Sequence, residues 1–114
     1  MKYLCLVYGE EAKIAAMDDA ECMSCVEGLL ESGHFIAGEA LQSVETATTL
    51  RIRNGKTTFT DGPFAETKEQ LAGFYLLEAR DLNEALDKAA KIPPARVGSI
   101  EVRPIRQLQA EAQT

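Results

Sequence analysis

The stretch LAGFYLLEARDLNEALDKAA, residues 71–90, decides the fold that we predict for this chain. Residues 71–79 read as a strand whose two faces are both apolar, because successive side chains of a strand point to opposite faces. Asp81 then has the position of a helix N-cap, with Glu84 three residues later as in a capping box. The apolar residues that follow recur at helical spacing: Leu82, Ala85, Leu86, Ala89 and Ala90. The stretch therefore predicts a strand and an amphipathic helix.

Strands and a second helix are predicted on both sides of this stretch. Residues 2–8 read as a first strand, again with two largely apolar faces. Asp18 has the position of an N-cap for a helix from about residue 19 to residue 32, which Gly33 would end. A short strand is predicted at 34–37. Pro93 and Pro94 stop the helix that begins after Asp81, and residues 98–105 form the last strand.

A β-hairpin is predicted in the middle of the chain. Residues 46–53 are β-branched and alternate, and Asn54-Gly55 follows them, which is the strongest short signal for a two-residue hairpin turn. Such a turn fixes the register, so Arg53 faces Lys56 and Leu50 faces Phe59. One face of the hairpin then holds Leu50, Ile52, Thr57 and Phe59, and the other holds Arg51, Arg53, Lys56 and Thr58. The sequence Asp61-Gly62-Pro63-Phe64 ends its second strand.

The order of elements is strand, helix, strand, hairpin, strand, helix, strand, which is typical of an α+β, ferredoxin-like antiparallel sheet with two helices on one face. Two helices cover only one face, yet the strands at 2–8 and 71–79 are apolar on both. We therefore expect a homodimer with sheets face to face, forming a dimeric α/β-barrel. Residues 1–106 are expected to form one domain, and residues 107–114 a frayed tail.

Charge and composition exclude several classes of function. The net charge of −6 argues against a nucleic-acid footprint and against electrostatic docking on anionic membranes. No apolar run approaches the roughly 20 residues of a membrane span, and the N-terminus lacks the features of a signal peptide. We therefore expect a cytoplasmic protein. No Gly-rich phosphate loop, nucleophile elbow or metal-ligand cluster is present, so no cofactor and no metal is expected.

The chain has three cysteines, Cys5, Cys22 and Cys25, and an odd count argues against a disulfide framework. Cys22 and Cys25 form a CxxC that could be redox-active or half of a zinc site. The alternative is that both are small buried hydrophobic residues in the middle of a helix, and we favour it because no second CxxC is present.

The charged residues around 61–68 are candidates for a ligand site. Asp61 could serve as a general base or position a ligand, or it could form an Asx turn ahead of Pro63. Glu66 and Lys68 could line a polar site with Asp61, or they could be solvated side chains of a charged loop.

Three arginines are further candidates for ligand binding. Arg51 and Arg53 share one face of the hairpin, and Arg103 lies on the last strand. Guanidinium groups suit a carboxylate or a phosphate. The alternative is that these arginines pair with acidic residues such as Glu101 or Glu78, or with the other subunit.

The single histidine, His34, could shuttle a proton, or it could be a helix C-terminal residue stabilised by the helix dipole. A catalytic role requires a carboxylate partner. An exposed His34 more than about 8 Å from every carboxylate would therefore argue against an enzyme.

Residues 61–105, which begin DGPFAETKE, resemble the DGPF proteins of the YCII-related superfamily, as do MKYLCLVY at 1–8 and GHFIAGEALQS at 33–43. The resemblance implies a ferredoxin-like fold that dimerises into an α/β-barrel. It also implies a setting near sigma-factor genes, which hints at stress or regulation. Some YCII-related enzymes resemble lactone isomerases and dehydrochlorinases and use a His–Asp pair, the histidine lying towards the end of the first helix. The predicted first helix has no histidine, and His34 lies just past it.

Two functions of different class follow. The first is a dimeric small-molecule-binding or regulatory module that holds a small polar or anionic metabolite near Asp61 and the arginines. The second is a cofactor-free lyase or isomerase in which His34 and Asp61 move a proton while an arginine stabilises negative charge.

Overall fold

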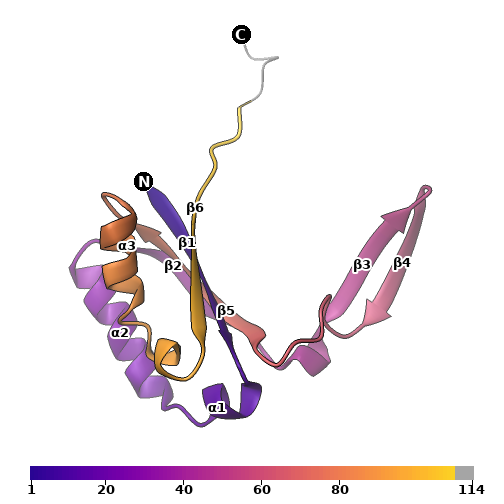
Figure 1. Ribbon diagram of the computed structural model, residues 1–114, viewed down its shortest axis with the longest axis horizontal. Helices are drawn as coiled ribbons and strands as arrows, with labels where there is room; N and C mark the ends of the chain where they lie inside the picture. Colours follow the sequence, from indigo (N-terminus) through magenta and orange to yellow (C-terminus); the bar gives the residue numbers. More distant parts are fainter. Residues whose placement is uncertain (110–114) are drawn as a thin grey trace.

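The main sheet has four antiparallel strands in the order β2-β5-β1-β6 (Figure 1). It is seen in a computed structural model that describes residues 1–109. The strands are β1 (Lys2–Gly9), β2 (Phe35–Ala40), β5 (Gln70–Glu78) and β6 (Ser99–Pro104). This order places β5 and β1, the predicted strands at 71–79 and 2–8, at the centre of the sheet, as in a ferredoxin-like fold. The α+β class and the antiparallel sheet are therefore confirmed.

Two main helices, α2 (Asp19–Glu31) and α3 (Leu82–Ala89), lie on one side of the sheet (Figure 1). The structure adds a short helix α1 (Glu11–Ala15) and two 3₁₀ turns, η1 (Val44–Thr46) and η2 (Pro93–Arg96). The sequence does not predict these three elements, because three to five residues are too few to show a helical period. None of the helices in the described residues is long and apolar enough to span a membrane.

The ends of α2 form as their sequence predicts. The Asp18 carboxylate accepts a hydrogen bond from the Ala20 N–H at 3.0 Å. At the other end Gly33 has φ 79°, and its N–H donates to the Leu30 carbonyl while the His34 N–H donates to the Leu29 carbonyl. This is the Schellman arrangement, which favours glycine because the left-handed conformation strains any residue with a Cβ. It turns the chain sharply and places His34 immediately before β2.

The predicted hairpin forms a separate two-stranded sheet of β3 (Thr48–Arg53) and β4 (Lys56–Asp61). Its register is the predicted one, with Arg53 opposite Lys56 and Leu50 opposite Phe59. Asn54 and Gly55 both have positive φ, as a type I′ turn requires. The hairpin does not extend the main sheet. It stands away from it, on the side opposite α2 and α3 (Figure 1). We call it the arm.

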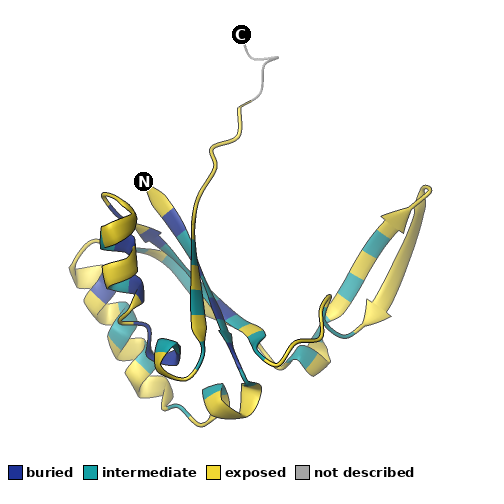
Figure 2. Ribbon diagram, in the orientation of Figure 1, coloured by how far each residue is buried: buried dark blue, intermediate teal, exposed yellow. Residues whose placement is uncertain are grey.

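The core lies between the main sheet and the helices (Figure 2). Its largest fully buried side chains are Leu29, Leu77, Ile92 and Cys5. Burial alternates along β1, where one face is buried and the other is only half-buried. The half-buried face carries apolar side chains of the two central strands: Leu4, Leu6, Tyr8, Phe74 and Leu76. This open face has the apolar character that the sequence predicts, and the second subunit expected to cover it stays a prediction.

Candidate functional site

Residues 62–69, between β4 and β5, join the arm to the main sheet and cross the base of the arm. We call this segment the DGPF loop. Gly62 has φ 104°, so the chain leaves β4 in a conformation that favours glycine. The Gly62 N–H donates to the Ala47 carbonyl at 2.8 Å, and the Thr49 hydroxyl donates to the Gly62 carbonyl at 3.0 Å. The turn is therefore held against the strand segment that enters the arm.

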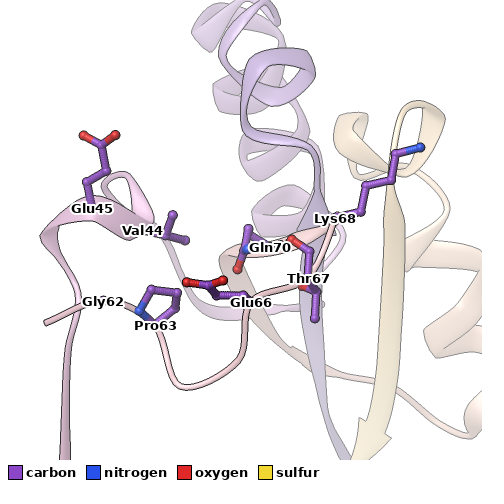
Figure 3. Close-up of a pocket in the computed structure, with 8 residues that line it drawn as sticks. All are labelled: Val44, Glu45, Gly62, Pro63, Glu66, Thr67, Lys68 and Gln70. Carbon is purple, nitrogen blue, oxygen red and sulfur yellow. Dashed lines mark hydrogen bonds between the residues drawn. The ribbon is translucent and has the colours of Figure 1, made fainter. Parts of the chain in front are cut away.

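A shallow hollow of about 580 Å³ lies beneath this loop. Its lining comes from the loop, η1 and the start of β5: Val44, Glu45, Gly62, Pro63, Glu66, Thr67, Lys68 and Gln70 (Figure 3). The Glu66 carboxylate points across the hollow towards Pro63, whereas Lys68 points away from it (Figure 3). The Lys68 ammonium lies 3.9 Å from a Glu10 carboxylate oxygen and is largely exposed. Of the two residues predicted to line a polar site, Glu66 is thus the one directed into the hollow.

A second, more apolar hollow of about 620 Å³ adjoins the first. The two share a wall of Val44, Pro63, Thr67 and Gln70. The apolar part of the second lining includes Tyr8, Leu41, Ala47, Phe64 and Leu71. Together the hollows offer an apolar surface beside a polar one, and we call them the loop site.

Of the three predicted arginines, one approaches the loop site. The Arg51 guanidinium lies 5.9 Å from the centre of the Phe64 ring, a cation–π distance. Arg53 donates to the carbonyl of Ile52. Arg103 lies on β6 and pairs with Glu101, with Nε 2.9 Å from the carboxylate oxygen. The structure therefore does not gather the three guanidinium groups, and Arg103 follows the alternative of pairing with Glu101.

His34 has a carboxylate partner, but that partner is Glu84 and not Asp61. Its Nε2 lies 3.3 Å from a Glu84 oxygen, and its Nδ1 lies 2.7 Å from the Ser32 hydroxyl. The expected His34–Asp61 pair is not formed, because the Schellman turn directs His34 towards the start of α3 while Asp61 ends β4 on the arm. The side chains of His34 and Glu84 are only 17% and 20% exposed. His34 is therefore neither exposed nor distant from every carboxylate, and the argument against an enzyme given above does not apply.

Glu84 is held in its ionised form. Its carboxylate accepts the Arg80 backbone N–H at 2.9 Å and lies 3.1 Å from the Arg80 guanidinium. These contacts, with a smaller contribution from His34, hold the pKa of Glu84 below its ordinary value.

A third hollow, of about 300 Å³, lies between α2 and the main sheet. Small residues on the sheet leave this space: Gly38, Ala40, Ala72 and Gly73. Longer side chains of the lining include Met17 just before α2, Cys22, Met23 and Val26 on α2, and Tyr75 on β5. Sequence reasoning did not identify this hollow as a site. The signal that could have found it is the run of small residues on two paired strands, because such residues cannot fill the space beneath a helix.

Burial favours the protonated, thiol form of the three cysteines. Desolvation by burial is the largest cause that raises the pKa of Cys22 and of Cys25, and it raises the pKa of Cys5 to about 11. Burial also raises the pKa of Tyr75 to about 12. Cys22 and Cys25 are half-buried, so the prediction that both are buried is wrong, and only Cys5 is buried. Because the thiolate is the reactive form, the raised pKa values still favour a packing role for the CxxC. Within residues 1–109, no group of three or more potential metal ligands is found.

Two comparisons relate this chain to known proteins. A model of the YCII-related domain matches residues 1–109, which is nearly the whole chain. An uncharacterized protein of Rhizobium meliloti (strain 1021) is 40% identical over 114 aligned residues, which cover 92% of each chain.

Proposed function

This chain belongs to the YCII-related family, and from that premise we propose that it is a homodimeric small-molecule-binding module with its ligand at the loop site. The observation that carries the proposal is the pair of adjoining hollows beneath the DGPF loop. Their volumes of about 580 and 620 Å³ lie in the range of small-molecule sites.

The chemistry of the lining favours a small amphipathic metabolite. Phe64, Leu71 and Tyr8 offer an apolar surface for its body. Thr67 and Gln70 lie in the shared wall and carry hydrogen-bonding groups for a polar end. Arg51 lies beside Phe64 and is placed to meet an anionic group there.

The proposed dimer fits a ligand at the loop site, because Tyr8 of the open face and its cross-strand neighbour Leu71 line the apolar hollow. Tyr8 and Leu71 come from the two central strands of the sheet. A second sheet packed about 10 Å away would cover them and close one side of the hollow. The ligand would then lie at the edge of the interface.

The dimer is tested with Leu6→Asp, which places a charge in the middle of the open face. Wild-type protein should have twice the chain mass by light scattering, and the variant should be monomeric or aggregated. A variant that is a dimer with unchanged stability would contradict the face-to-face dimer.

The ligand site is tested by a thermal-shift screen of small carboxylates and phenols. A true ligand at 100 times its dissociation constant stabilises the folded state by about 2.7 kcal/mol, which is about 10 °C in melting temperature for a domain of this size. Phe64→Ala should abolish the shift with little effect on the fold, because Phe64 is 80% exposed. Thr60→Ala, an exposed strand residue outside the hollows, is the matched control. Equal shifts in both variants would place the ligand elsewhere.

A cofactor-free lyase or isomerase is the second candidate, and the contact between His34 and Glu84 favours it. A charged carboxylate orients an imidazole and supports proton transfer by it. The substrates to screen are unsaturated lactones and organochlorines that can lose HCl. Turnover should be lost in His34→Gln and reduced in Glu84→Gln, and Asp61→Asn should leave it unchanged. Turnover that survives His34→Gln would exclude this mechanism.

A further inference from the structure

The arm exposes an apolar face that has no cover in the described part of the chain. Leu50, Ile52 and Phe59 lie on that face and are 54%, 59% and 69% exposed. The two strands of the arm contact mainly each other. An isolated two-stranded hairpin is at best marginally stable in water, so this geometry requires a partner surface.

The arm and residues 105–109, which follow β6, both extend away from the compact body (Figure 1). The radius of gyration of the chain is 16.5 Å, whereas about 13 Å is expected for a compact domain of this length. The molecule measures 48 × 47 × 19 Å, and in the two long dimensions the helices and the arm lie on opposite sides of the sheet (Figure 1).

The net charge of the arm indicates which kind of surface it binds. Residues 48–61 contain three cations, Arg51, Arg53 and Lys56, and one carboxylate, Asp61, which give a net charge of +2. Because the whole chain carries −6, the remainder carries −8. The body of a second copy is therefore opposite in charge to the arm, which favours their encounter. The three cations lie on the face of the arm opposite Leu50, Ile52 and Phe59, so they act at long range and stay in solvent when the apolar face packs.

Length indicates where the arm lies in a face-to-face dimer. Six residues of β-strand span about 20 Å, and packed sheets are about 10 Å apart. The arm leaves the subunit on the side of the open face (Figure 1). It is therefore long enough to pass the interface and lie along the body of the other subunit.

From these observations we propose that the β3–β4 arm is a clasp that packs its Leu50, Ile52 and Phe59 face on a second copy of this chain. The inference rests on the dimer proposed above and adds a second contact to it. The arm of each subunit holds the other, and the base of each arm carries the DGPF loop. Dimerisation thereby also fixes the loop site.

The test compares Phe59→Glu with Thr58→Glu, which places the same charge one residue away on the opposite face of the same strand. Phe59→Glu should raise the dimer dissociation constant about 10- to 100-fold, the loss expected for one buried phenylalanine. Thr58→Glu should change it less than threefold. The dissociation constants are measured by sedimentation across a dilution series. Far-ultraviolet circular dichroism confirms that both variants are folded.

Hydrogen exchange of wild-type protein gives a second readout that requires no arm variant. Backbone amides of residues 48–61 should exchange more slowly in the dimer than in Leu6→Asp monomer. A stable dimer whose arm amides exchange as fast as in the monomer, or in which both glutamate variants have equal dissociation constants, would overturn the clasp and leave the sheet dimer standing. A wild-type chain that stays monomeric at every concentration would overturn both.

Discussion

Replacing Gly98 with alanine is expected to destabilise the fold strongly, because β1 passes directly over the position. A Cβ on Gly98 would lie 2.1 Å from the Tyr8 carbonyl oxygen and 3.0 Å from the Gly9 Cα. Both neighbours are backbone atoms, so no side chain can turn away to make room. An ordinary contact starts near 3.4 Å, so the two backbones must separate by more than about 1 Å.

The magnitude follows from that separation. Overpacking of this kind costs about 1–3 kcal/mol. The shift also weakens the hydrogen bonds where Tyr8 pairs with Ser99, each of which contributes about 1 kcal/mol. We therefore expect a loss of about 2–4 kcal/mol, or about 8–16 °C in melting temperature.

Gly28→Ala is the matched control, because the same substitution at that position should raise the stability of the fold and not lower it. Gly28 lies inside α2, and nothing lies within 4 Å of the position of its added Cβ. Alanine favours a helix interior over glycine by about 1 kcal/mol, so the melting temperature should rise by about 4 °C.

Both variants are compared with wild type by urea and thermal unfolding at one protein concentration, because the proposed dimer would make stability depend on concentration. A Gly98→Ala protein within about 0.5 kcal/mol of wild type would refute the close approach of β1 and its consequence.

Three further predictions concern the core, the pH dependence and the cysteines. Leu77→Ala should cost about 2–5 kcal/mol, because Leu77 is 0% exposed, and a cost below about 1 kcal/mol by urea unfolding would contradict its place in the core. The lowered pKa of Glu84 means that its ionised form stabilises the fold above the ordinary value of 4.5, and that this contribution is lost as the pH falls through the lower folded-state pKa. Melting curves from about pH 6 to about pH 3 should therefore show wild type losing its advantage over Glu84→Gln, whereas a constant difference would argue against that role. Cys22 and Cys25 should react slowly with a thiol reagent at neutral pH and faster as the pH rises, and rapid labelling at pH 7 would contradict their raised pKa values.

Local signals in the sequence predicted the local structure well. Asn54-Gly55 gave the type I′ turn and, through it, every pair of the hairpin register. Gly33 ended α2 with the expected left-handed residue, and helix α3 began after Asp81, whose carboxylate accepts the Glu84 N–H at 2.9 Å. Each of these signals acts within a few residues, so the sequence contains both partners of the interaction.

The candidate site was predicted less well, because its contacts join residues far apart in the chain. The loop and the direction of Glu66 agree with a polar site, but Lys68 points away and Arg103 pairs on its own strand. His34 meets Glu84, fifty positions later, and nothing in the spacing of either residue indicates that contact.

By itself, the sequence determined the α+β class, the two capped helices, the hairpin register and the apolar character of both sheet faces, because propensity, capping and alternation depend on neighbouring residues. Only the tertiary structure decided that the hairpin leaves the main sheet as an arm, that His34 pairs with Glu84, and that small residues of β2 and β5 leave a hollow under α2. These features depend on how α2, α3 and the strands pack in three dimensions. That packing is set by the fit of side chains across the whole domain, and local patterns such as the small residues at 38, 40, 72 and 73 do not by themselves show which element lies over them.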